Sequence, residues 1–261
     1  MQGRLVKYCC KAHNVVLGSP FLQLGTFDYY RGLDPNSAIA DPEEATHSVN
    51  FREGVETAMN NDTLNRVFGG GIGISEGDLT IIAGPEARFT SFVGNAYIFC
   101  TSIATADDPP SIDRGKQLNP DYDSMWEITD PLVFRDTIGS ALLDIITIDN
   151  LVPEARSAVL SLPIKELTLQ VQMLDKPVQY FEKRGHKVEN SHDIDLLPDH
   201  KDALAAAIFQ KDKKDAYQRE YRFAFMVTHP RLGHLSVMPD PILIPLNRLH
   251  HSVSAIVTEF I

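Results

Sequence analysis

The sequence predicts an α+β fold in which strands outnumber helices. Several short segments are rich in aromatic and β-branched residues, whereas helical spacing is confined to a few stretches. Strand and helix signals do not alternate regularly, which disfavours a doubly wound parallel sheet. Of the 261 residues, 43% are hydrophobic and 23% are charged, enough for one large globular domain or two small ones.

The first part of the chain is predicted to form strands separated by turns. Residues 14–30 contain short apolar runs interrupted by Gly18, Pro20 and Gly25, a pattern typical of strands rather than of a helix. Residues 41–44 can open a short helix, because Pro42 suits its first position.

The next hundred residues mix a helix, two strands and a long loop. Residues 51–68 have partly helical spacing and end at a glycine run, which we interpret as a hinge or tight turn because no Gly-Lys-Ser/Thr follows. Residues 79–83 and 89–101 are strand candidates. Residues 105–123, rich in Pro and Asp, are predicted to be a long loop.

Three helices are predicted in the second half of the chain. Apolar residues recur at helical spacing over residues 134–148, and Asp130-Pro131 marks the start of that helix. Residues 154–160 are predicted to form a second helix, and the alanine-rich residues 201–209 a third.

The second half of the chain also contains five strand candidates. Residues 167–173 alternate cleanly between polar and apolar, and residues 178–181 are expected to pair beside them. Residues 220–227 form an aromatic strand, and residues 242–246 and 253–257 supply the last two candidates.

Charge and cysteine content limit the class of protein. The net charge of −11 and the pI near 5.2 argue against a general polyanion-binding surface. Cys9, Cys10 and Cys100 make no disulfide framework, because the count is odd and adjacent cysteines rarely pair. The sequence has neither a secretory apolar run at its start nor a stretch long enough for a membrane helix. We therefore expect a cytoplasmic protein that does not enter a membrane.

Gln218 and Glu220 are the first candidates for chemistry. If the strand begins by Gln218, the two side chains project the same way and place an amide beside a carboxylate. Such a carboxylate can stabilise an oxocarbenium-like sugar centre and hold a ribose hydroxyl, while its neighbour orients a nucleophile.

Two stretches earlier in the chain supply further candidate residues. Arg31 ends the aromatic, strand-like run of residues 26–30 and precedes a glycine. Residues 97–102 form a second aromatic run, which ends in Thr101 and Ser102.

An arginine, then an aromatic run with Ser/Thr, then Gln-x-Glu, in that order, resembles the arginine-serine-glutamate class of ADP-ribosyltransferases. The resemblance implies a split pair of mainly antiparallel sheets around an NAD cleft, with peripheral helices. It also implies a glycosyltransferase that uses NAD as substrate, moves ADP-ribose to a macromolecular acceptor and releases nicotinamide. The separations, 102 − 31 = 71 and 220 − 102 = 118 residues, imply a single domain over residues 1–261 with large insertions.

The resemblance also assigns a role to each matching residue. Arg31 would hold the NAD diphosphate, Ser102 or Thr101 would brace the nicotinamide ribose, and Glu220 would grip that ribose. Gln218 would help place the acceptor. The residues that would pack on the nicotinamide ring are Tyr97, Phe99 or Tyr217.

The chain departs from the family pattern at Cys100, which stands where the first serine of an aromatic-Ser-Thr-Ser motif is expected. A thiol is a weak hydrogen-bond partner, so that role is either degraded or moved to Thr101 or Ser102. Cytoplasmic enzymes of this kind resemble toxins and antiviral defence effectors, with an inhibitory partner protein. The acceptor is a protein, a nucleic acid or simply water. A local basic group could receive a nucleic acid: Lys211, Lys213, Lys214, Arg219 and Arg222.

Two other interpretations stay open. Oxygen and imidazole ligands for a divalent metal in a nuclease or hydrolase gather in one segment, at His192, Asp193, Asp195, Asp199 and His200. Alternatively, the protein is a non-catalytic binding protein and Gln-x-Glu only ends a strand. Dependence on NAD, on metal or on neither separates the three interpretations.

Overall fold

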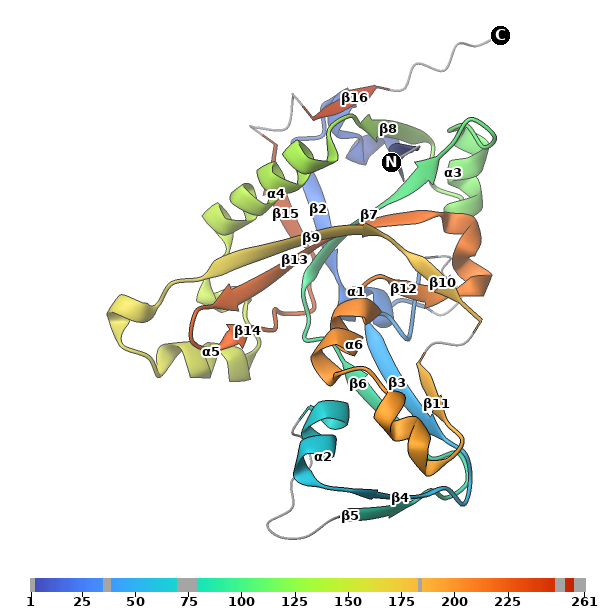
Figure 1. The fold of residues 1–261 in the computed structure, drawn as a ribbon. Helices are drawn as coiled ribbons and strands as arrows, with labels where there is room; N and C mark the ends of the chain where they lie inside the picture. The colour runs from blue at the N-terminus through green and yellow to red at the C-terminus, as the bar shows by residue number, and fades with distance from the viewer. Residues whose placement is uncertain (1–2, 35–38, 70–78, 183–184, 247–251, 256–261) are drawn as a thin grey trace. The chain divides into compact units, whose positions relative to one another are not determined.

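The computed structural model describes residues 3–34, 39–69, 79–182, 185–246 and 252–255. The chain divides into two compact units. The first unit contains residues 1–42, 94–178 and 215–261, and the second contains residues 43–93 and 179–214. Both units combine helices with strands, and the strand pairs of the described chain are mainly antiparallel, so the α+β expectation is confirmed (Figure 1). The parallel pairs, β10 with β12 and β11 with β3, belong to the second unit.

The first unit is built on one large sheet. Its strands are β1 (Arg4–Cys9), β2 (Phe21–Thr26), β7 (Tyr97–Ala104), β8 (Ser124–Ile128), β9 (Gln170–Pro177), β13 (Glu220–His229), β14 (Gly233–His234), β15 (Ile242–Pro245) and β16 (Val253–Ala255). Its α-helices are α1 (Phe27–Arg31), α3 (Ile112–Leu118), α4 (Pro131–Ile145) and α5 (Pro153–Leu160).

The sheet splits into two branches at β7. On one side, β7 pairs along its length with β13, which in turn pairs with β9. On its other side, β7 pairs with β2 at Tyr97 and Ile98 and with β1 at residues 102–104. From there β2 continues to β15, and β1 continues to β8 and β16. The two branches therefore separate at residues 99–101 of β7.

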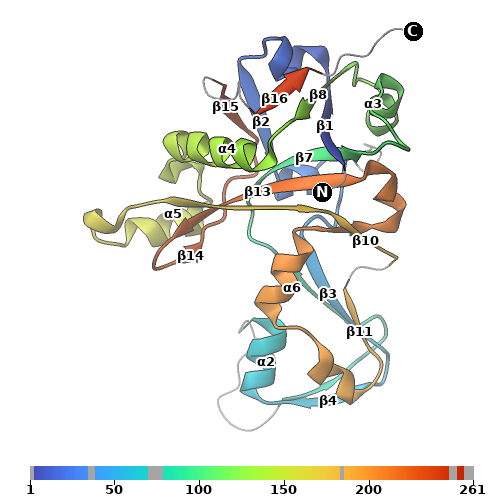
Figure 2. The same cartoon turned by 45° about the horizontal axis from the view of Figure 1, so that its top comes forward.

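Helices cover the two faces of this sheet. Phe134 and Ile138 of α4 pack in the main core with aromatic residues of β7 and β13, and α4 lies along β9 (Figure 2). Gly139 allows this close approach, because a Cβ there would lie 2.1 Å from Met173 Sδ. On the opposite face, Leu118 of α3 packs against Val6 and Tyr8 of β1.

Helix α4 begins at the Asp130-Pro131 pair that the sequence predicted. Asp130 Oδ1 accepts hydrogen bonds from the backbone N–H groups of Leu132 (3.1 Å) and Val133 (3.0 Å). Pro131 occupies the first turn, where its missing N–H costs nothing. The predicted helix over residues 134–148 is confirmed, with its first turn three residues earlier and its end at Ile145.

The second unit has its own apolar core. Its strands are β3 (Thr46–Phe51), β4 (Glu56–Met59), β5 (Leu79–Ile82), β6 (Arg88–Phe92), β10 (Gln179–Phe181), β11 (His186–Val188) and β12 (Gln210–Asp212). Its α-helices are α2 (Asn61–Phe68) and α6 (His200–Ala207). The core contains Leu64, Val67 and Phe68 of α2 together with residues of β3 and of the antiparallel pair β4 and β5.

Helix α2 ends where the glycine run begins. Asn60 caps its first turn by accepting from Thr63 N at 2.9 Å. Gly69 follows with φ 68°, a left-handed conformation that glycine adopts at helix ends. The rest of the run, residues 70–73, lies outside the described residues.

Four expectations for local structure are wrong. Residues 27–31 form α1 instead of a strand, because Thr26 Oγ1 caps a helix by accepting from Tyr29 N. The expected helix start at residues 41–44 is absent, because residues 42–45 form a turn. The predicted loop over residues 105–123 contains α3, whose cap is Ser111. Residues 179–181 pair with β12, whereas β9 pairs with β13.

No helix within the described part of the chain is long and apolar enough to cross a membrane.

Candidate functional site

Glu220 is the first residue of β13, and Gln218 is not in that strand. Gln218 ends a short 3-10 helix, Lys213–Gln218, and Arg219 follows with φ 45°. This left-handed residue breaks the extended chain, so the period-two argument does not reach back to Gln218. The strand does not begin by Gln218, so the condition for the expected placement of the amide beside the carboxylate is not met.

Glu220 instead has Ser102 as its neighbour. The register of β13 and β7 pairs Glu220 with Ser102 and Arg222 with Cys100. Directly opposed residues of antiparallel strands project from the same face, so these four side chains share one face of the sheet. Glu220, Ser102 and Arg222 are buried, and Cys100 is partly buried.

An ion pair within β13 holds Glu220. Arg222 Nε and Nη2 each lie 2.8 Å from Glu220 Oε1. The Arg222 side chain is fully buried and that of Glu220 is only 5% exposed. Charge-assisted bonds of this length are strong when water is excluded, so Arg222 fixes the position of the Glu220 carboxylate.

Tyr97, Phe99 and Thr101 project from the opposite face of β7. Tyr97 and Phe99 belong to the main core, where Phe99 lies 5.4 Å from the Phe134 ring centre. Thr101 Oγ1 donates to Tyr221 O at 3.2 Å. Of the two hydroxyl candidates, only Ser102 shares a face with Glu220.

Arg31 and Tyr217 lie on other elements of the first unit. Arg31 is the last residue of α1, and its Nε donates to Asp28 Oδ1 at 3.2 Å, with Nη2 also paired to that oxygen. Because α1 directly follows β2, Arg31 belongs to the β2 branch of the split sheet. Tyr217 is 39% exposed, and its carbonyl accepts a hydrogen bond from Arg114.

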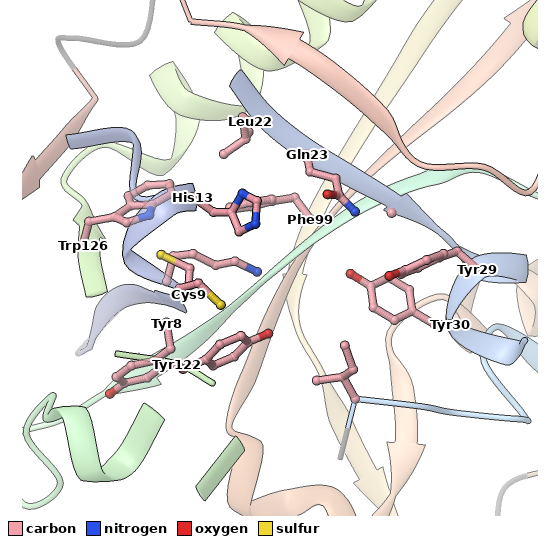
Figure 3. Close-up of a pocket in the computed structure, with 14 residues that line it drawn as sticks. Tyr8, Cys9, His13, Leu22, Gln23, Tyr29, Tyr30, Phe99, Tyr122 and Trp126 are labelled. Carbon is pink, nitrogen blue, oxygen red and sulfur yellow. The ribbon is translucent and has the colours of Figure 1, made fainter. Parts of the chain in front are cut away.

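A pocket of about 170 Å³ lies where the two branches separate. One wall comes from the β1 branch, with Lys7, Cys9 and Trp126, and the other comes from β2 and α1. In Figure 3, Tyr29 and Tyr30 enter from the side opposite His13 and Trp126. The complete lining is Lys7, Tyr8, Cys9, Cys10, His13, Leu22, Gln23, Gly25, Tyr29, Tyr30, Ile39, Phe99, Tyr122 and Trp126.

Lys7, which lines the pocket, also contacts β7. Its Nζ donates to the Cys100 carbonyl at 2.9 Å and lies 4.7 Å from the centre of the Phe99 ring. The ammonium therefore interacts with the backbone at the point where neither β1 nor β2 pairs with β7. A cation over an aromatic face is also favourable in itself.

Tyr30 lines the pocket and lies within electrostatic range of Glu220. Burial raises the pKa of the Tyr30 phenol well above its usual value, and the nearby Cys100, Tyr122 and Glu220 raise it further. Burial also raises the pKa of Tyr122 to about 12. Both phenols therefore stay protonated, as hydrogen-bond donors, at neutral pH.

No protein-family model, curated protein or solved structure matches this chain.

The segment proposed to bind metal has a structural role. Asp193 Oδ2 accepts from the backbone N–H groups of Glu189 (2.7 Å) and Asn190 (3.0 Å), which fixes a helix start. Among the described residues, no group of three or more His, Cys, Asp or Glu side chains could hold a metal ion.

The predicted basic group is largely neutralised by carboxylates. Four of its five members form ion pairs: Lys213 with Glu182, Lys214 with Asp212, Arg219 with Asp108 and Arg222 with Glu220. A nucleic acid would have to compete with these carboxylates for the cations.

Sequence reasoning missed Lys7, Tyr30, Tyr122 and Trp126 as site residues. The one available signal was Lys7, a cation between the apolar residues Val6 and Tyr8 of a strand. The other three were ordinary aromatic residues of apolar segments, and only the split of the sheet gives them a common cavity.

Proposed function

We propose that the protein is an NAD-dependent mono-ADP-ribosyltransferase. One observation carries the proposal: three segments that are far apart in the sequence lie on neighbouring elements of one split sheet. Arg31 follows β2, Ser102 lies on β7 and Glu220 begins β13, and β7 pairs with both of the other strands. A split sheet with these residues around it is the arrangement that the family resemblance implies.

The pocket suits one end of the substrate. An engineered cavity of about 150 Å³ holds a benzene ring, so a pocket of about 170 Å³ admits one aromatic ring. Phe99 supplies the aromatic wall that the resemblance requires, whereas Tyr97 and Tyr217 do not line the pocket. The nicotinamide ring would occupy the pocket, and the ribose and diphosphate would extend towards Glu220 and Arg31.

The reaction moves positive charge from the nicotinamide ring to the ribose. When the bond between ribose C1′ and the ring nitrogen breaks, the electron pair stays on nitrogen and the ring becomes neutral. The Lys7 ammonium repels the positively charged nicotinamide ring of bound NAD and so raises its free energy. This repulsion disappears as the bond breaks and the ring becomes neutral. Glu220 stabilises the oxocarbenium-like ribose that forms. The acceptor then bonds to C1′ and loses a proton.

Arg222 and Ser102 would have supporting roles. Arg222 holds one oxygen of Glu220 in place, which fixes the carboxylate before the substrate binds. Ser102 would donate a hydrogen bond near the ribose. A macromolecular acceptor, an inhibitory partner protein and a toxin or defence setting in the cytoplasm belong to the same proposal.

The proposal is tested by NAD binding and nicotinamide release. We expect calorimetry to detect NAD binding by the wild type. Arg31→Ala should weaken binding at least about tenfold, because a charge-assisted contact to the diphosphate is lost. Glu220→Gln should keep binding but slow nicotinamide release about 100-fold or more.

The matched control is Arg4→Ala. Arg4 also forms an ion pair, with Glu127, but it lies at the start of β1 and does not line the pocket. It should change neither measurement by more than about twofold. Absence of NAD binding by the folded wild type at millimolar NAD would refute the proposal.

A further inference from the structure

The pocket at the split of the sheet is rich in hydrogen-bond donors and contains no acidic side chain. None of its lining residues is Asp or Glu. Its polar groups include the Lys7 ammonium, the Gln23 amide and the phenols of Tyr29, Tyr30 and Tyr122. In Figure 3 the Tyr30 and Tyr122 hydroxyls point towards the middle of the pocket. An electropositive, donor-rich cavity favours a ligand that carries negative charge and accepts hydrogen bonds.

Two of these donors retain unused bonding capacity. Lys7 Nζ carries three N–H donors, and its hydrogen bond to the Cys100 carbonyl uses one. The Trp126 side chain is 1% exposed, and its indole nitrogen has no hydrogen-bond partner among the residues described. Burial raises the pKa of the adjacent Cys9 thiol to about 11, whereas the charge of Lys7 and the Trp126 N–H lower it. A neutral thiol is a poor acceptor, so a buried donor remains unsatisfied.

The aromatic residues that line the pocket favour a flat ligand. Phe99 and Trp126 stack with their ring centres 6.0 Å apart and an interplanar angle of 29°. Tyrosine rings from α1 stand across the cavity (Figure 3). The volume admits one aromatic ring with a small substituent, and apolar walls with a few placed polar groups are typical of small-molecule sites.

We propose that this pocket binds a planar aromatic carboxylate, with the ring between the aromatic walls and the carboxylate at the Lys7 ammonium. The specificity follows from the charges: Lys7 attracts a carboxylate, tolerates a neutral amide of the same shape and repels an aromatic cation. This ligand class goes beyond ADP-ribosyl transfer and does not depend on it, because the pocket would bind the acid whether or not NAD is a substrate.

Saturation-transfer NMR with benzoate, benzamide and N-methylpyridinium as probes tests the proposal. We expect benzoate to bind with a dissociation constant on the order of 1 mM and benzamide about tenfold more weakly. The cation should not bind detectably, because it lacks the ribose and diphosphate that would hold NAD in place against the same repulsion. Lys7→Met should weaken benzoate about tenfold and abolish its advantage over benzamide. Lys11→Met is the matched control, since Lys11 is exposed and does not line the pocket.

A second variant covers the case in which Lys7→Met does not fold. Tyr30→Phe removes one hydroxyl from the pocket and should weaken benzoate about threefold or more. Lack of benzoate binding, equal binding of the cation, or an equal loss in Lys11→Met would overturn the proposal. Benzoate selectivity without NAD binding would refute only the transferase function, whereas NAD binding without benzoate selectivity would refute only this inference.

Discussion

At the scale of single residues, the ion pair of Glu220 and Arg222 has a structural consequence that is separate from the proposed reaction. Both side chains project from one face of β13, where burial removes the water that would otherwise solvate their charges. Two such charges are stable together because each compensates for the lost solvation of the other. Removing either side chain therefore affects folding as well as any reaction.

We expect Arg222→Met to lower the free energy of unfolding by about 3–5 kcal/mol, because Glu220 would stay buried without its two N–H donors. Urea denaturation followed by circular dichroism measures this change. The control is Arg231→Met, because Arg231 pairs with Glu166 but its side chain is 61% exposed. That surface pair should contribute less than about 1 kcal/mol. Equal losses in the two variants would contradict a special role for the buried pair.

At the scale of elements, the contact of α1 with β2 shapes the pocket. Gly25 of β2 lies under the ring of Tyr30, and a Cβ at position 25 would come within 2.6 Å of that ring. Glycine is required here for the close approach of a side chain rather than for its own backbone angles. The Tyr30 ring can lie against β2 only because this Cβ is absent.

Gly25→Ala should therefore displace the Tyr30 ring without unfolding the first unit. We expect a stability loss of about 1–3 kcal/mol from overpacking and at least a threefold weaker binding of benzoate. Thermal unfolding and saturation-transfer NMR measure the two effects. If Gly25→Ala binds benzoate as the wild type does, Tyr30 does not form the pocket wall.

The sequence predicted elements whose signals are local. The strand over residues 220–227 and the helix that begins after Asp130 are confirmed, because alternation and a capping residue are properties of neighbouring residues. Residues 27–31 were misassigned because their aromatic composition favours a strand, whereas the Thr26 cap and the packing of Tyr30 on Gly25 favour a helix.

The candidate site was less predictable, because it depends on long-range register. The pairing of Glu220 with Ser102 could not be read from residues that lie 118 positions apart. The left-handed Arg219, which removes Gln218 from the strand, has no local signature either, since arginine rarely adopts that conformation. The roles of Arg31, Ser102 and Glu220 towards NAD stay predictions.

At the scale of the whole molecule, two separate apolar cores predict that the units differ in their response to acid. In the second unit, burial lowers the pKa of His47 to about 4, with smaller effects from His186 and His200. The ring centres of His47 and His186 lie 5.3 Å apart. Below pH 6.5 the unfolded chain gains a proton that the folded chain does not, so stability is full above that pH and falls towards pH 4.

At pH 5 this effect amounts to about 2 kcal/mol for the second unit. Trp126, the only tryptophan, lies in the core of the first unit. We expect far-ultraviolet circular dichroism at pH 5 to show a first thermal transition before tryptophan fluorescence changes. His47→Gln should bring the two transitions closer together. If the circular dichroism and fluorescence transitions of the wild type coincide at pH 5, the second unit does not unfold independently of the first.

The position of β7 in the sheet also determines when the protein can fold during synthesis. β7 pairs with a strand made 104 − 4 = 100 residues earlier and with another made 220 − 102 = 118 residues later. At ribosomal rates the second interval lasts roughly 6–24 s, during which β7 emerges without β13. The hydrogen-bonding edge that β13 later covers stays exposed for that time, as an attachment point for chaperones or for other nascent chains. A chain that stops before Glu220 should therefore aggregate, even though it contains most of the elements of both units.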